Sequence, residues 1–367
     1  MIGPKAYIHL SRLEQNIANI QRAVGDRTLM VVVKANGYGH GSLNIAKHLS
    51  KNSDIIFCVF TIEEAMNLRQ GGIKNPILIF SRIQKEWIEL ARKYDLWINA
   101  SDLDDLKLIA KIFKNKSDCP SIHLKFDTGM TRLGFDHKEN ESIFKYLLKN
   151  PQLDVQGIYS HFATADEGDL SYAEYQLKIF NKILNNGEKL GFKFKFIHCS
   201  NSGALLNLPT SLFNTVRVGM LAYGIAPSNE VEMKIDVDPV MSFCGPIINL
   251  RRVGPNTQVS YGGVYSTKRM TTIGVIQTGF ADGFPRPWYD NGYVSYKGKY
   301  YNIAGRVCMD QFMVDFGDST PNLGDEVLIF GKKDNDELSV ELIANNINST
   351  TYVLLTAIQG RTEHILI

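Results

Sequence analysis

The chain has 367 residues, with 40 Lys and Arg against 38 Asp and Glu, so its net charge is +2. This balance excludes a protein that binds nucleic acid mainly through phosphates, because such a protein needs a basic surplus concentrated on one face. At 44% hydrophobic and 21% charged residues the composition is that of a globular chain, and its length predicts one large and one small domain rather than a single core.

Strand and helix patterns alternate through the first 230 residues. Eight short runs rich in β-branched or aromatic residues are predicted as strands, at 29–33, 55–60, 77–80, 96–99, 122–126, 155–160, 194–199 and 215–218. Apolar residues recur at helical spacing beside them, and capping boxes are predicted at Ser11 with Glu14 and at Thr61 with Glu64, with a further helix start at Ser101. Because parallel strands need helical crossovers, these units predict the α/β fold class, with an N-terminal (β/α)8 barrel of the TIM type.

The pattern changes beyond about residue 236. Short apolar runs are broken there by Gly, Pro, Asn and Asp, with one helical segment after Ser339. This texture predicts a mostly β C-terminal domain. We place the domain boundaries at 1–232 for the barrel and 233–367 for the β domain, and residues 1–10 could pack with the second domain rather than the first.

The cysteines and the apolar runs indicate in which cellular compartment the protein is located. Five cysteines, an odd number without a CxxC pair, argue against a disulfide framework and against a structural zinc site, so no metal is expected. No apolar run is long enough to span a bilayer, and residues 1–12 have no export-signal core. The expectation is a cytoplasmic protein without a membrane partner.

The first barrel strand runs into an unusual segment, VVVKANGYGHG at residues 31–41. The working residues of a TIM-type barrel follow the C-terminal ends of its strands, and Lys34 stands at such an end. A desolvated lysine there has a lowered pKa and can act as a nucleophile that forms a Schiff base, whereas an arbitrary lysine is usually a solvated loop residue. The P-loop pattern is absent.

This segment resembles the pyridoxal 5′-phosphate (PLP) attachment segment of the alanine racemase family. The resemblance implies that Lys34 carries PLP covalently and that Tyr38 also binds this cofactor. It further implies an isomerase, a PLP-dependent amino-acid racemase that interconverts L-alanine and D-alanine and supplies D-alanine for cell-wall peptidoglycan.

The segment KFDTGMTRLG, residues 125–134, follows the fifth strand. A guanidinium near the barrel mouth can clamp a substrate carboxylate in a bidentate fork, and a surface salt bridge is the ordinary alternative. The segment resembles the substrate-clamp loop of the family, which implies that Arg132 binds the substrate carboxylate. Lys125 matches a lysine that is carbamylated in some members, where the carbamate orients the arginine.

The last strands of the barrel also end in polar residues. Histidines at two successive strand ends, His161 and His198, favour a site over a structural role. By resemblance, His161 lies beside the PLP ring and His198 orients Arg217. Arg217 is buried by its position and needs a partner for its charge; the family places it at the pyridine nitrogen.

The loops after strands seven and eight are the recurrent phosphate site of such barrels. Ser202 and the Gly219 backbone therefore suit the PLP phosphate, and Asn201 is also a plausible helix N-cap. Tyr352 resembles the tyrosine that reaches this phosphate in the family.

The second domain carries two further family-like segments, at residues 259–263 and 305–311. The resemblance implies that Tyr261 is the second catalytic base, and that Met309 and Asp310 lie at the substrate carboxylate. It also implies that Tyr261 and Met309 come from a partner subunit, so the active unit is a homodimer with shared sites.

Two residues depart from the family pattern, and three rival functions compete with the one that the resemblance implies. Phe280 replaces a tyrosine common in the entrance wall, and Val218 replaces a proline. The rivals are a racemase for serine, lysine or a broad set of amino acids, a non-enzymatic PLP carrier, and a PLP decarboxylase of similar architecture. Carriers of this kind consist of the barrel alone, and such decarboxylases place an acid where Arg217 stands.

Overall fold

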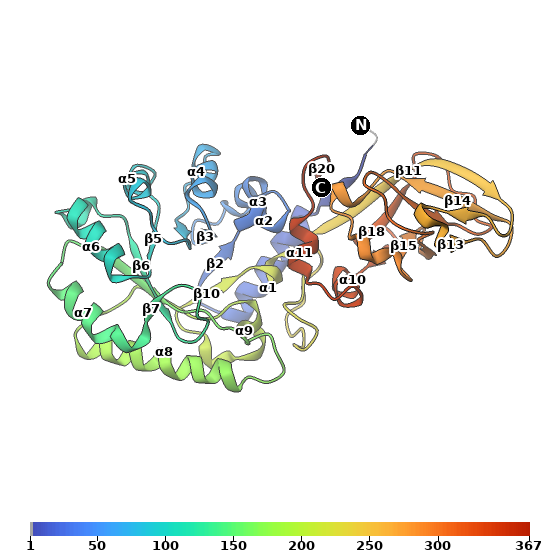
Figure 1. The fold of residues 1–367 in the computed structure, drawn as a ribbon. Helices are drawn as coiled ribbons and strands as arrows, with labels where there is room; N and C mark the ends of the chain where they lie inside the picture. Colours follow the sequence, from blue (N-terminus) through green and yellow to red (C-terminus); the bar gives the residue numbers. More distant parts are fainter. Residues whose placement is uncertain (1–2) are drawn as a thin grey trace.

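The first domain of the computed structural model, which describes residues 3–367, is a barrel of eight parallel strands surrounded by helices (Figure 1). The barrel strands are β2 (Thr28–Val32), β3 (Ile56–Val59), β4 (Ile77–Ile79), β5 (Ile98–Ala100), β6 (Ile122–Asp127), β8 (Val155–Tyr159), β9 (Phe196–His198) and β10 (Thr215–Val218), and a two-residue strand, β7 (Phe135–Asp136), pairs with β6. They pair in the orders β10-β2-β3-β4 and β5-β6-β8-β9, with a parallel bridge from Leu78 to Trp97 between the two groups. The predicted barrel is confirmed.

Helices surround the barrel strands. They are α1 (Leu10–Val24), which precedes β2, and α3 (Ser42–Leu49), α4 (Ile62–Gln70), α5 (Lys85–Lys93), α6 (Leu103–Ile112), α7 (Asn140–Leu148), α8 (Ser171–Lys189) and α9 (Ser202–Asn207). The short segment α2 (Lys34–Tyr38) contains residues with non-helical φ and ψ angles and is a turn at the end of β2. No helix within residues 3–367 is both long and apolar enough to cross a bilayer.

The N-termini of three helices test the capping residues predicted from the sequence. The capping box at Thr61 and Glu64 is present in both directions. The one predicted at Ser11 is wrong: α1 begins at Leu10, without a side-chain cap, and the N–H of Leu10 instead donates to the carbonyl of Ile367 at 2.8 Å. The start at Ser101 is also displaced, since the side chain of Asp102 caps α6.

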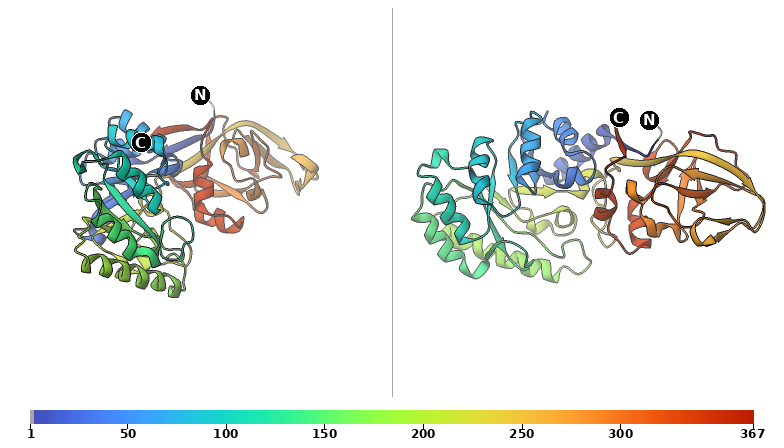
Figure 2. Two further views of the ribbon diagram at one scale, coloured as in Figure 1. Left: turned by 60° about the vertical axis from the view of Figure 1, so that its left-hand side comes forward. Right: turned by 45° about the horizontal axis from the view of Figure 1, so that its top comes forward.

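The C-terminal domain is mostly β, as predicted. Its strands are β11 (Met241–Val253), β12 (Gln258–Val259), β13 (Tyr265–Ser266), β14 (Thr271–Ile276), β15 (Tyr293–Tyr296), β16 (Lys299–Asn302), β17 (Phe312–Asp315), β18 (Glu326–Lys333), β19 (Asp336–Leu338) and β20 (Glu363–Leu366), and its helices are α10 (Val340–Asn346) and α11 (Thr351–Thr356). The main sheet has the order β16-β15-β18-β11-β1-β20, with β14 beside β11. Figure 2 shows this domain extending away from one side of the barrel, with α11 lying between the two.

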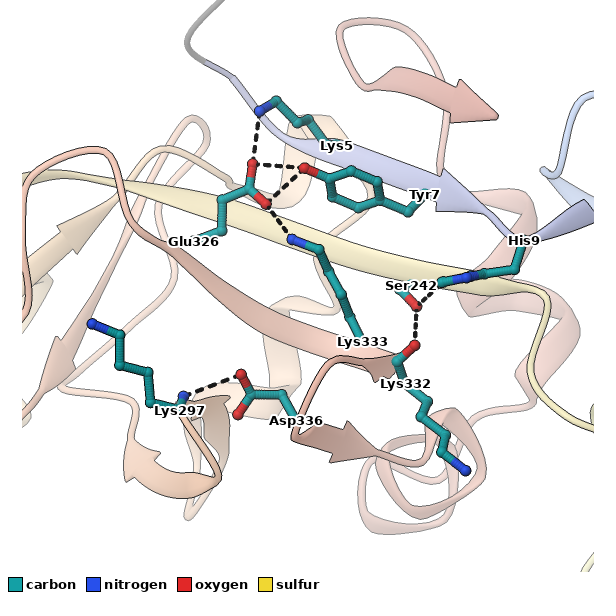
Figure 3. Close-up of polar contacts among 9 residues, drawn as sticks. All are labelled: Lys5, Tyr7, His9, Ser242, Lys297, Glu326, Lys332, Lys333 and Asp336. Atoms are coloured by element: carbon teal, nitrogen blue, oxygen red, sulfur yellow. Dashed lines mark hydrogen bonds and ion pairs between the residues drawn. The ribbon is translucent and has the colours of Figure 1, made fainter. Parts of the chain in front are cut away.

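The N-terminal strand β1 (Lys5–Ile8) belongs to this second sheet, where it pairs antiparallel with β11 and parallel with β20. Residues 1 and 2 lie outside the described residues. Glu326 of β18 anchors β1 across the strand between them, β11. It accepts hydrogen bonds from Lys5 Nζ at 2.7 Å, Tyr7 Oη at 2.8 Å and Lys333 Nζ at 2.9 Å (Figure 3). One carboxylate thus joins the first strand of the chain to a strand more than 300 residues later.

Replacing Glu326 by Gln is expected to lower the free energy of unfolding by about 2 kcal/mol, because two lysines lose their shared anion. Burial raises the pKa of Glu326, but the bonds from Lys5, Lys333 and Tyr7 together outweigh burial and hold it below its usual value. A depressed carboxyl pKa stabilises the fold above the unfolded value of about 4.5, and this contribution is lost as the pH falls through the folded value.

Urea unfolding at neutral and at acidic pH measures both effects. The difference between wild type and Glu326→Gln should shrink in acid. Asp318→Asn is the matched control, because its ion pairs with Arg252 and Arg269 are solvent-exposed, and it should leave the midpoint nearly unchanged. An equal response of the two variants would contradict an anchoring role for Glu326.

Candidate active site

A cavity of about 570 Å³ opens at the C-terminal ends of the barrel strands, where a barrel of this type carries its working residues. Most residues singled out in the sequence line it, namely Lys34, Tyr38, Lys125, Arg132, His161, Asn201, Ser202, Arg217, Gly219 and Tyr352. Tyr352 comes from α11, which lies beside α2 at the barrel mouth (Figure 1). Both domains therefore contribute side chains to the cavity.

Lys34 begins a turn with left-handed backbone geometry. The φ angles are 51° at Ala35, 54° at Asn36 and 50° at Tyr38. Such a conformation costs about 1–2 kcal/mol for each residue that carries a Cβ, so the surroundings must hold it. Gly39 follows with a φ of 83°, and a Cβ there would lie 2.1 Å from the carbonyl oxygen of Leu355 in α11, which only glycine avoids.

Two side chains within the segment help to hold this turn. His40 is fully buried, and its Nδ1 lies 3.0 Å from the carbonyl oxygens of both Gly37 and Tyr38. Asn36 accepts a hydrogen bond from the N–H of Ser42 through its side-chain oxygen at 3.1 Å. The glycine-rich turn expected from the sequence is therefore a fixed structure and not a pliable loop.

Positive charge concentrates around the Lys34 amine. Burial lowers the pKa of Lys34, and the charges of Arg132 and Arg217 lower it further, while Glu64 opposes them. Burial also lowers the pKa of Lys125 to about 8, again with help from Arg132 and Arg217. Both amines therefore have a larger neutral fraction near neutral pH than a solvated lysine, as a nucleophile or a base requires.

Arg217 is the most enclosed of these cations. Its Nη1 donates to the carbonyl oxygen of His198 at 3.0 Å, and its Nη2 donates to the carbonyl oxygens of Ser160 at 2.9 Å and Cys199 at 3.1 Å. All of these acceptors are neutral carbonyl oxygens. Within residues 3–367, no group accepts a hydrogen bond from Nε of Arg217. The guanidinium therefore keeps a donor for a ligand of the cavity and retains an unneutralised charge.

The imidazoles beside Arg217 are held in their neutral form. Arg217 Nη1 lies 2.8 Å from His198 Nδ1, and His198 Nε2 lies 2.9 Å from His123 Nδ1. Because arginine can only donate, His198 accepts at Nδ1 and carries its proton on Nε2, which it donates to His123. Burial and then the charge of Arg217 lower the pKa of both His198 and His161 well below the usual value.

Hydroxyl groups from three segments of the chain, on Tyr38, Ser202 and Tyr352, also line the cavity. Ser202 Oγ accepts the N–H of Gly219 at 3.1 Å, and the side chain of Asn201 caps α9 through the N–H of Ala204, as predicted. A Cβ on Gly219 would lie 2.8 Å from the Tyr38 hydroxyl. Burial raises the pKa of Tyr38, and burial raises that of Tyr352 to about 12, so both phenols stay protonated donors.

Comparison with known proteins decides the family. The family models described as "Alanine racemase, N-terminal domain" and "Alanine racemase, C-terminal domain" match residues 8–227 and 240–366. The chain belongs to the alanine racemase family.

Relatives and solved structures of this family match the whole chain. An alanine racemase of Desulforamulus reducens is 38% identical over 99% of this chain and 98% of its own, and one of Methanococcus maripaludis is 35% identical over 98% and 97%. The solved alanine racemase of Clostridium difficile 630 has a TM-score of 0.93 at 32% identity, covering 100% of this chain and 96% of its own. The protein is accordingly an isomerase, a racemase, which excludes the carrier and decarboxylase alternatives.

Four of the racemase's predicted site residues do not line the cavity. His198 lies buried behind it, against Arg217. Tyr261 and Met309 of the C-terminal domain are 69% and 56% exposed. Asp310 is also exposed and pairs with Arg361 at 2.8 Å. Within a single chain, Tyr352 is therefore the one predicted residue of the C-terminal domain that lines the cavity with Lys34.

Other lining residues were not predicted. Arg82 follows β4 and is held by Asp105 at 3.0 Å, while Asp166 lies in the loop after β8. Both follow strand ends, which was the available signal, but each belongs to a segment without a recognisable motif. Glu64 was predicted only as half of a capping box, although its carboxylate also reaches the Lys34 turn.

Proposed function

We propose that this racemase is an alanine racemase that uses PLP and interconverts L-alanine and D-alanine with two bases on opposite faces of the α-carbon. The observation that carries the proposal is the convergence of Lys34, Arg132 and Arg217 on one cavity, which suits an anionic cofactor and a carboxylate substrate. The cell-wall role of D-alanine and the cytoplasmic location belong to the same proposal through the family resemblance.

The residues of the cavity fit PLP. The hydroxyl of Ser202 and the protonated phenols of Tyr38 and Tyr352 are donors suited to a phosphate, and Gly219, whose N–H donates to Ser202 Oγ, leaves open the space that a Cβ would fill. Lys34 would hold the aldehyde carbon, with Arg217 as donor to the ring nitrogen. When bound, PLP supplies an electron-withdrawing ring that acidifies the α-carbon proton.

Arg217 sets how strong this withdrawal is. Its guanidinium stays protonated, so it would donate to the ring nitrogen and leave that nitrogen without a proton of its own. Through this contact Arg217 would weaken the electron withdrawal, which would suit proton exchange and disfavour transamination. His198, neutral and bonded to Nη1, keeps the guanidinium in this orientation.

Each of the two bases removes the α-proton of one alanine enantiomer. Lys34, with its lowered pKa, takes the proton from D-alanine, and the phenol of Tyr261 takes it from L-alanine. Arg132 holds the substrate carboxylate, with Met309 as a backbone donor and Asp310 beside it. The exposure of Tyr261 and its distance from its own cavity support a two-fold dimer in which each subunit completes the site of the other.

Lys125 is proposed to carry a carbamate. Its lowered pKa of about 8 leaves neutral amine available to attack CO₂, forming an N–C bond and releasing one proton. The resulting anion would sit beside Arg132, whose charge already acts on the Lys125 amine, and would orient that guanidinium.

Proton exchange in heavy water tests the function and the substrate together. The purified chain, supplied with PLP, is incubated with L-alanine, L-serine or L-lysine, and the enantiomers and α-deuteration are measured. Alanine should exchange at least about tenfold faster than the other two, because a close wall rejects each added group by a modest factor. Similar rates for all three would establish a broad-specificity racemase, and no exchange with any of them would overturn the proposal.

A further inference from the structure

Glu64 joins two strand-end loops at the barrel mouth. Its Oε1 accepts the backbone N–H of Ala35 at 2.6 Å. Its Oε2 accepts the N–H groups of Phe60 at 2.8 Å and Thr61 at 3.2 Å. The Phe60 and Thr61 bonds lie at the start of α4, whereas the Ala35 bond crosses to the first residue of the left-handed turn that follows Lys34.

We propose that Glu64 is a positioning residue of this racemase: its carboxylate fixes the strained turn that follows Lys34 and places a negative charge on the backbone N–H of the next residue, Ala35. The inference rests on the proposed function, because it takes Lys34 as the cofactor lysine. Helix capping alone requires only the bonds within 60–64, so the bond to Ala35 is an additional task for the same side chain.

The geometry explains why an acid serves here. Ala35 adopts a φ of 51°, which an L-residue avoids unless its backbone groups are held. A carboxylate can accept from several N–H donors at once, whereas an amide of the same size turns an NH₂ donor toward one of them. Glu64 is therefore matched to three donors from two loops.

The charge of Glu64 acts in the opposite sense to its neighbours. The groups that face Lys34 are Arg132 from the loop after β6, Arg217 from β10, Cys58 from β3 and Glu64 from α4. Burial and the two arginines lower the pKa of Lys34, while Glu64 raises it. Removing Glu64 should thus leave the amine more neutral but on a looser turn.

Two readouts on the full chain without added PLP test this role in Glu64→Gln. The first is the pH dependence of Lys34 acylation, followed by peptide mass spectrometry, in which the apparent pKa of Lys34 should fall by on the order of half a unit. The second is amide hydrogen exchange over 35–38, which should accelerate about tenfold with loss of the Ala35 bond.

Thr61→Ala is the matched control. It removes the hydroxyl that caps the N–H of Glu64 but leaves the carboxylate on Ala35, so both readouts should match wild type. Glu64→Asp keeps the charge on a shorter side chain; it should speed exchange with little change in the Lys34 pKa, and it covers the case in which Glu64→Gln folds poorly. Unchanged readouts in both Glu64 variants, or equal changes in Thr61→Ala, would overturn the inference.

Failure of the proposed function would look different. If Lys34 were not the cofactor lysine, PLP would remain attached after Lys34 is replaced, yet the acylation profile of Lys34 would still report on Glu64. If PLP attaches to Lys34 and the Glu64 variants behave as wild type, only the positioning role fails.

Discussion

Lys34→Ala is expected to abolish both racemisation and the visible absorbance of attached PLP. The substitution removes the amine that would bind the cofactor covalently and would also act as the base for D-alanine, so turnover should fall by at least about 10³-fold. No other lysine replaces it, since Lys125 leaves the barrel from a different strand, β6. Absorbance after gel filtration with PLP and the racemisation rate measure the two losses.

Lys47→Ala provides the control for this prediction. Lys47 is exposed on α3, thirteen residues after Lys34, and it lies outside the cavity. Its replacement should change neither absorbance nor rate. Retained absorbance together with retained turnover in Lys34→Ala would reject Lys34 as the cofactor lysine and, with it, the proposed function of the cavity.

The barrel could be predicted because its strands are buried along most of their length. Runs such as those of β3 and β4 are apolar at every position, which is typical of parallel strands covered on both sides. Lys34 follows the apolar run that contains β2, and Arg217 is the third residue of the four-residue strand β10, so their places near the strand ends could also be predicted from the sequence. Closure of the barrel brought them into one cavity.

The sequence could not show hydrogen bonds between residues that lie far apart along the chain. The start of α1 depends on the carbonyl of Ile367, at the far end of the chain. The second partner of Glu64, the N–H of Ala35, lies 29 residues away and is invisible to a capping-box pattern. His123 accepts the hydrogen bond from His198, which in turn pairs with Arg217, yet it stands early in β6, before the strand-end position where a site residue is expected.

Tyr261 posed a different difficulty, because within one chain it is exposed and does not line the cavity. Tyr261→Phe is expected to keep the visible absorbance of attached PLP and to lose solvent-proton incorporation that starts from L-alanine, by about 10²–10⁴-fold. The phenol oxygen is the only atom removed, so binding should survive. Tyr300→Phe, an exposed tyrosine of the same domain, should retain the full rate. An unchanged rate in Tyr261→Phe would remove it as a base.

Mixing the two inactive variants tests whether the bases come from different subunits. After subunit exchange between Lys34→Ala and Tyr261→Phe chains, half of the dimers are mixed, and each mixed dimer has one site with both bases intact. Activity should therefore recover to about a quarter of the wild-type value if each site takes Lys34 from one subunit and Tyr261 from its partner. If both residues served the same site from one chain, no mixed dimer would have an intact pair, and the mixture would stay inactive.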